Sequence, residues 1–312
     1  MFRYVLKRIE LAVVTVLLVI VILFFLMHLM PGSPFNGDRL TAEQQALLEE
    51  SYGLDKPILV QAGIYVKNML TGDFGVSYAI QQNYPVAKFL AVRFPVTIRI
   101  SLQAFVLGLV LGILLGIAAA LKHNSAVDTG ASLLSMIGSA IPSYVFALGL
   151  VYFLAYKAGW FPLTYDAKAP FLSSVLPTVA LSIMPMSMAA RHTRNEMIEV
   201  MNSEYMALAE LKGISRFRVI AVHGLKNALI PLITAMGPMI LTLIIGSTVV
   251  EQIFSIPGIG SLFINAINAK DFNVVISLAF IFSVLYIGIM LVIDLLYGVI
   301  DPRIRVAGGE KR

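Results

Sequence analysis

Residues that commonly carry chemistry are sparse in this sequence of 312 residues. It has no cysteine, which excludes disulfides and thiolate metal sites. The four histidines, His28, His123, His192 and His223, are isolated, and none belongs to an H-E-x-x-H zinc helix. No G-x-S-x-G nucleophile elbow occurs either. We therefore expect a chain that is not an enzyme and holds no metal.

Nucleotide hydrolysis by this chain is also not expected. A phosphate-binding loop of the type G-x-x-x-x-G-K-[ST] needs a Gly-Lys pair, because the lysine reaches the phosphates that the backbone N–H groups cradle. The sequence contains no Gly-Lys pair. If the chain works with ATP, another chain must therefore hydrolyse it.

Two carboxylates fall in apolar stretches, Glu251 near the outer end of one stretch and Asp294 within the last. An ionisable residue inside a membrane is a candidate functional group. A proton- or sodium-coupled carrier would place such groups near the midplane. One of these carboxylates is close to an interface and the other can pair near the inner end, so the pattern favours structural roles for both.

Composition indicates a membrane protein. Hydrophobic residues make up 58% of the chain and charged residues 13%, whereas a soluble domain is about a quarter charged. A membrane-spanning helix needs about 20 apolar residues. Six segments are long enough, which predicts an all-α membrane protein with six transmembrane helices: 9–30, 97–121, 129–156, 172–190, 229–253 and 274–300.

The termini are predicted to lie in the cytoplasm. The first apolar run, 9–30, is longer than the core of a signal peptide and lacks a small-residue cleavage site, so we expect it to be retained. Basic residues concentrate in the segments that face inward if the N-terminus is cytoplasmic. The net charge of +5 therefore indicates membrane orientation rather than nucleic-acid binding.

The connection after the first span is too long for a simple turn. In the segment 31–95, Thr41 and Gln44 form a capping-box pattern. Gly53 could end that helix, and Pro57 could open the next one. A mobile linker is the alternative, but the apolar content of the segment favours an ordered helical cap on the outer side.

Small residues in the second span predict close helix packing. Gly108, Gly112 and Gly116 recur every four residues and so share one helical face, which lets a neighbouring backbone approach. The sequence leaves open whether that neighbour belongs to this chain or another. Prolines that would kink or break helices also occur in or near the spans, at Pro142, Pro177, Pro185 and Pro238.

The connection 191–228 is charged and predicted to be cytoplasmic. Ser203 can cap a short helix over 204–212, and Gly213 can end it. Ser215 can then cap a second helix that runs towards the next span. The pattern predicts a short helix-turn-helix that protrudes into the cytoplasm. An amphipathic helix lying on lipid headgroups fits the pattern equally well.

The residue types in this loop help to decide between the protruding helix-turn-helix and the helix on lipid headgroups. EYMALAELKG at 204–213, followed by HGLKNALIP at 223–231, resembles the EAA loop of ATP-binding-cassette (ABC) importer permeases. The closer resemblance is to the oligopeptide, dipeptide and nickel permease family. Ala209 and Gly213 match the general E-A-A-x-x-x-G pattern, and the two positions before Ala209 depart from it.

The resemblance covers nearly the whole chain, and Pro34-Phe35 favours the oligopeptide branch. Further matching segments are PGSPF at 31–35, YGLDKP at 52–57, GDFG at 72–75, PGIG at 257–260, DLLY at 294–297 and DPRIR at 301–305. The resemblance implies the transmembrane-domain fold of a type I ABC importer. Its expected parts are an N-terminal span (1–30), the external helical cap (31–95), a permease core (96–304) and a cytoplasmic tail (305–312).

The family resemblance also implies function and partners. The chain would line a path for oligopeptides in the bacterial cytoplasmic membrane together with a second, homologous permease. Two ABC ATPases using ATP and Mg²⁺ would drive it, and an extracellular or periplasmic peptide-binding protein would deliver cargo. A dipeptide or nickel permease is the nearest alternative, and a stand-alone secondary carrier is more remote.

Two groups of site residues follow from the resemblance. Those expected to contact the ATPase are Glu204, Tyr205, Ala209, Glu210, Lys212, Gly213, Ser215 and Arg216. Those expected at an outer gate, or at the docking site of the binding protein, are Glu251, Pro257, Gly258 and Gly260.

Overall fold

The structure is a computed structural model that describes residues 2–29, 56–212, 215 and 218–300. The described part is mainly helical, which confirms the predicted all-α class. It divides into two compact units, one made of residues 1–95 with 258–312 and the other of residues 96–257. The last two helices therefore belong to the same unit as the first helix and not to the unit of residues 96–257.

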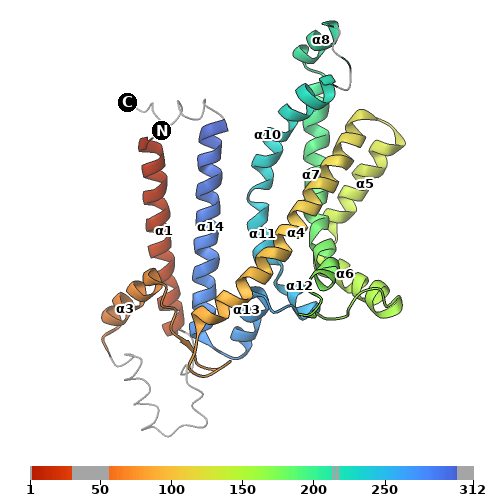
Figure 1. Cartoon of the computed structure of the whole chain (residues 1–312). Coiled ribbons are helices and arrows are strands. Elements are labelled where there is room, and N and C mark those ends of the chain that lie inside the picture. The colour runs from red at the N-terminus through yellow and green to blue at the C-terminus, as the bar shows by residue number, and fades with distance from the viewer. Residues whose placement is uncertain (1, 30–55, 213–214, 216–217, 301–312) are drawn as a thin grey trace. The chain divides into compact units, whose positions relative to one another are not determined.

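Two long apolar helices, α1 (Phe2–Leu29) and α14 (Phe272–Ile300), form the frame of the first unit. They lie side by side (Figure 1). Both are apolar around most of their circumference and largely unburied within the chain, as expected of helices that face lipid. Helices are thus present at the predicted first and last spans.

A shorter helix, α3 (Ile58–Thr71), packs against this frame. It begins directly after Pro57, as predicted, and ends at Gly72, whose φ of 77° is left-handed. Glycine adopts that conformation without steric cost. The capping box and Gly53 of the predicted external cap lie outside the described residues.

A small hairpin follows, which the sequence did not predict. Strand β1 (Val76–Ser77) pairs antiparallel with β2 (Tyr84–Pro85). Asp271, in the turn between α13 (Ile259–Asn268) and α14, is fully buried beside this hairpin.

Asp271 holds the hairpin through one carboxylate oxygen. Its Oδ2 accepts hydrogen bonds from Ser77 Oγ at 2.5 Å and from the N–H groups of Ala79 at 3.0 Å and Ile80 at 3.1 Å. Asn273 adds two bonds, because its Nδ2 donates to the carbonyls that precede and follow Gly75. A buried carboxylate with three donors is well satisfied, so Asp271 ties the hairpin to the start of α14.

Replacing Asp271 with alanine should release the hairpin. Two backbone N–H groups would lose a charged acceptor, which costs about 1–3 kcal/mol for each buried group left unpaired. We expect hydrogen exchange at Ala79 and Ile80 to accelerate at least about fivefold, measured by mass spectrometry on peptides covering 76–85. The control is Asp73→Ala, since Asp73 accepts only a local bond from the Gly75 N–H and is exposed. Equal exchange in both variants would contradict the assignment.

The second unit contains most of α4 (Val86–Leu121) and the elements between α4 and Pro257. These are α5 (Ala126–Ala140), α6 (Ser143–Leu150), the π-helix η2 (Val151–Lys157), α7 (Pro170–Met201), α8 (Glu204–Leu211), the π-helix η3 (Val219–Gly224), α10 (Leu225–Met236), α11 (Met239–Gly246) and α12 (Thr248–Ile253).

The described residues hold four helices that are long and apolar enough to cross a membrane, namely α1, α4, α7 and α14. A fifth span results if α5 and the helix after it count together, although they meet at 98°. Pro142 causes this break, because it stands in extended conformation between the two helices.

The expected fifth span, 229–253, is divided among α10, α11 and α12, and it remains a prediction. Pro238 stands at the start of α11, as a helix breaker should. Pro177 and Pro185, in contrast, lie inside α7 without interrupting it. Neighbouring helices can compensate for the backbone donors that prolines lack in membrane helices.

The glycine face of α4 lies against α7 of the same chain. A Cβ atom built on Gly108 would stand 2.6 Å from the Ser182 carbonyl oxygen, and one on Gly112 would stand 2.5 Å from that of Met186. Real Cβ atoms do not approach so closely, so only glycine permits this contact. The question left open by the sequence is answered: the partner helix is internal.

Leucine at Gly112 should force α4 and α7 apart. Overpacking a tight contact costs about 1–3 kcal/mol, so we expect a lower Tm of the detergent-purified chain. The matched control is Gly130→Leu, because a side chain at Gly130 on α5 would meet open space. A Tm of Gly112→Leu equal to that of the control would show that the two helices do not need this contact.

Candidate functional site

The predicted loop helix is present as α8, which ends one residue before the predicted limit of Lys212. It follows α7 after only two residues and lies beyond the end of that helix (Figure 1). Ser203 makes the turn: its Oγ donates to the Val200 carbonyl at 2.5 Å, and its own carbonyl accepts from the Met206 N–H at 3.1 Å. A short helix is thus fixed directly to the end of a long one.

One side of α8 is buried on its own unit and another side is open. Met206 packs with Val219 against Val200 and Met201 at the end of α7. Leu208 and Leu211, in contrast, are 53% and 85% exposed. A side chain as apolar as leucine gains free energy when it leaves water, so this open side suits contact with another surface.

The remaining residues of the predicted ATPase contact are only partly described. Glu204, Lys212 and Ser215 are exposed. Tyr205, Ala209 and Glu210 belong to α8, but the structure does not describe their side chains. Gly213 and Arg216 lie outside the described residues.

The second helix predicted for this loop does not stop before the next span. The π-helix η3 begins at Val219 and continues without a break into α10. A helix is therefore present along the predicted course towards Asn227, and it extends past that residue to Met236.

A buried ion pair joins α5 to α7 near the end of α7 that leads to α8. Arg194 Nε donates to Asp128 Oδ1 at 2.5 Å, and Arg194 Nη2 donates to Asp128 Oδ2 at 2.8 Å. The Asn124 N–H and His123 Nδ1 both lie 3.0 Å from Oδ2. Sequence analysis did not identify this site, because two opposite charges 66 residues apart have no pairing pattern in one sequence.

Glu251 lies inside the protein and not at its surface. Its side chain is 1% exposed, and its Oε1 accepts hydrogen bonds from Thr97 Oγ1 at 2.6 Å and Ser247 Oγ at 3.1 Å. It thereby ties α12 to the N-terminal part of α4. Its assignment to an outer gate or to a docking site stays a prediction.

The other three residues of the predicted outer gate surround the division of the chain. Pro257 is the last residue of the second unit, and Gly258 is the first residue after it. Gly258 is extended and precedes α13, whereas Gly260 is buried within that helix.

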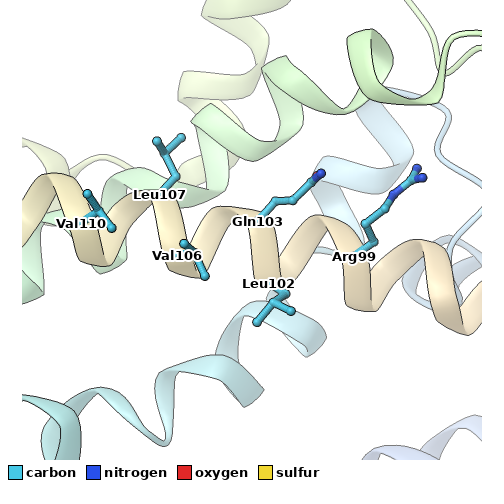
Figure 2. Close-up of a pocket in the computed structure, with 6 residues that line it drawn as sticks. All are labelled: Arg99, Leu102, Gln103, Val106, Leu107 and Val110. Carbon is cyan, nitrogen blue, oxygen red and sulfur yellow. The ribbon is translucent and has the colours of Figure 1, made fainter.

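An open groove of about 530 Å³ runs along one face of α4 (Figure 2). Its lining is mainly apolar and comes from Arg99, Leu102, Gln103, Val106, Leu107 and Val110. Arg99 and Gln103 point to the same side (Figure 2). Arg99 Nη2 donates to the Tyr165 hydroxyl at 3.0 Å, and Gln103 Oε1 accepts from Thr178 Oγ1 at 3.3 Å. Sequence reasoning missed this groove, although its spacing of three and four residues marks one helical face.

Among the described residues, no three His, Asp or Glu side chains are grouped closely enough to hold a metal ion. The features of the described part that stand out are surfaces and packing contacts. Its features are an exposed short helix, a buried ion pair behind it and an apolar groove.

Two family descriptions together account for most of the chain. Residues 112–306 match "Binding-protein-dependent transport system inner membrane component". Residues 1–101 match the N-terminal part of the membrane component of binding-protein-dependent transport systems.

Curated relatives match over nearly their whole length. The dipeptide transport system permease protein DppB of Lactococcus lactis subsp. cremoris is 41% identical over 98% of this chain and 100% of its own. DppB of Bacillus subtilis is 38% identical over 98% and 99%. The oligopeptide transport system permease protein OppB of Escherichia coli K12 is 40% identical over 98% and 100%.

Two solved structures share the fold. A chain of the methionine ABC transporter MetNI, in inward-facing conformations, gives a TM-score of 0.58 at 15% identity, covering 68% of this chain and 96% of that one. A chain of an amino acid ABC transporter with histidines gives 0.54 at 16% identity, covering 67% and 92%. These likenesses confirm the predicted transmembrane-domain architecture of type I ABC importers. The chain belongs to the family of binding-protein-dependent transport system inner membrane components, the membrane-spanning permeases of ABC importers.

Proposed function

We propose that this chain pairs with a second, homologous permease to form the path of a bacterial importer for oligopeptides. Two ABC ATPases would supply energy from ATP and Mg²⁺, and an external binding protein would deliver the peptide. Both termini would lie in the cytoplasm. The observation that carries the proposal is α8, a short helix fixed to the end of α7 with two exposed leucines, in a chain of this family.

The proposed role of α8 is mechanical. A helix with an exposed apolar face can bind in a groove of a partner protein, and burial of that face stabilises the contact. In this proposal Leu208 and Leu211 enter a groove of one ATPase, with Glu204 and Lys212 at the rim. We refer to α8 from here on as the coupling helix. The small residue Gly213 would allow a sharp exit from it.

The groove along α4 is the proposed contribution to the translocation path. Peptides vary in their side chains, and an open, mainly apolar groove accepts many of them without specific bonds. Arg99 and Gln103 supply polar groups that a peptide backbone or its terminus could contact. Glu251, Pro257, Gly258 and Gly260 are proposed to belong to the outer gate.

The most specific part of the proposal is the length of the peptide cargo. The Pro34-Phe35 pair favours the oligopeptide branch, whereas the cited dipeptide and oligopeptide permeases are about equally identical to this chain. A dipeptide or nickel permease and, more remotely, a stand-alone carrier remain the alternative functions.

The test is reconstitution of the chain in proteoliposomes with its second permease, ATPases and binding protein. We expect uptake of radiolabelled peptides of four to six residues. This range is an assay choice for the oligopeptide class, and such peptides are roughly the size of a drug-like ligand or larger. Uptake should require both ATP and the binding protein. Transport by the purified chain alone would instead support a carrier, and uptake restricted to dipeptides or to a nickel chelate would reassign the cargo.

Replacing Leu211 with aspartate should weaken ATPase binding. Burying a leucine contributes about 1.5–3 kcal/mol, so its loss should reduce ATPase affinity roughly tenfold or more. The measurement is the amount of ATPase that co-purifies with the chain at a series of ATPase concentrations. Leu59→Asp is the matched control, because Leu59 is 76% exposed on the short helix α3. Equal recovery of ATPase with both variants would rule out the proposed seat of the coupling helix.

A further inference from the structure

Resting on the proposed function, we infer that the ion pair between Asp128 and Arg194 is a positioning pair that makes α4, α5 and α7 follow the coupling helix as one body. Neither residue contacts the ATPase or the peptide in this mechanism. The pair transmits the movement that the coupling helix receives.

The geometry of the pair fixes orientation as well as distance. Two separate nitrogens of Arg194 meet the two separate oxygens of Asp128, so the planar groups are held edge to edge. The side chain of Asp128 is only 6% exposed and that of Arg194 25% exposed, so water competes little for either. A shift of α5 along α7 by even one residue would break both bonds together.

Asp128 also holds the turn that enters α5. The chain reverses between α4 and α5 at Asn124, which has a left-handed φ of 61°. The Asn124 N–H and the His123 ring both reach Asp128 Oδ2. The end of α4 and the start of α5 therefore meet at the carboxylate that Arg194 grips.

The backbone at Arg194 touches α4 directly. A Cβ atom on Gly116 would stand 3.0 Å from the Arg194 backbone nitrogen and 2.6 Å from the Ala190 carbonyl oxygen. Arg194 thus joins α4 through its backbone and α5 through its side chain. Three helices meet at a single residue of α7.

The same residue lies close to the coupling helix. Arg194 stands about two turns, or roughly 10 Å, before α7 ends at Met201, and α7 is an unbroken helix of 32 residues. Met197, one turn beyond Arg194, is fully buried against Ala120 of α4 and Ala228 of α10. Rigid helices with packed side chains carry displacement, so movement of α8 reaches Arg194 before it reaches the rest of α7.

The stability of the fold alone does not explain why this position holds a charged pair. A buried ion pair often stabilises no more than apolar residues of similar volume, whereas removing only one partner leaves an unpaired charge. Single variants can therefore fail to fold. The double variant Asp128→Leu with Arg194→Met fills the site without charge and removes the fixed orientation, so it separates positioning from folding.

The experiment uses the complete reconstituted complex and measures ATP hydrolysis and peptide uptake in the same vesicles. For the double variant we expect normal assembly with the ATPases and at least about fivefold more ATP hydrolysed per peptide imported, the lower end of usual coupling strengths. Arg194→Lys, which keeps the charge but loses the two-pronged contact, should give an intermediate ratio.

Arg191→Gln is the matched control. Arg191 lies one turn before Arg194 on α7 and also reaches α5, but through a single hydrogen bond from Nη1 to Ser139 Oγ at 3.0 Å. Its ratio of ATP to peptide should equal that of the wild type.

Four results would overturn the inference. A double variant with the wild-type ratio would show that the pair only stabilises the fold, and so would equal losses of hydrolysis and uptake. If Arg191→Gln raised the ratio as much as the double variant, the ion pair would have no special role. Failure of the wild-type complex to import peptides with ATP would refute the proposed function itself, and with it this inference.

Discussion

The close contact between α4 and α7 is the constraint on which the second unit depends. Gly108, Gly112 and Gly116 bring the two backbones so near that a single methyl group would overlap a carbonyl oxygen. Lipid offers no hydrophobic driving force between helices, so close van der Waals contact must supply the attraction. At its end, α7 also leads into α8, the proposed coupling helix. The helix that determines the position of α4 is therefore the one that carries the proposed ATPase contact.

Besides the glycine contact, buried carboxylates hold the helices and turns in place. Asp128 and Glu251 in the second unit, and Asp271 in the first, each accept at least two hydrogen bonds, of which at least one comes from a segment distant in the sequence. Removing a charge from water is costly unless several donors replace the solvent. Each of these carboxylates therefore specifies one arrangement of its neighbours, because any other arrangement would leave it unsatisfied.

Hydropathy and local capping explain how much of this could be predicted from the sequence. The long apolar runs predicted α1, α4, α7 and α14, and the pattern around Ser203 predicted α8. These features depend on neighbours within a few residues. The partner of the glycine face, the ion pair at Asp128 and the donors around Asp271 depend on contacts between distant segments, and the two-residue strands are too short to give a periodic pattern.

The helical segments before and after α8 differ in continuity, and in the proposed mechanism this difference gives them different mechanical roles. On one side, α7 runs unbroken through Pro177 and Pro185. On the other side, the path from Val219 to Ile253 changes from a π-helix to α-helix and is interrupted again near Pro238 and Ser247. Bending a helix where its hydrogen-bond ladder is already interrupted breaks few further bonds. In the proposed mechanism, a displacement of the coupling helix would therefore be conveyed by α7 and absorbed along α10 to α12.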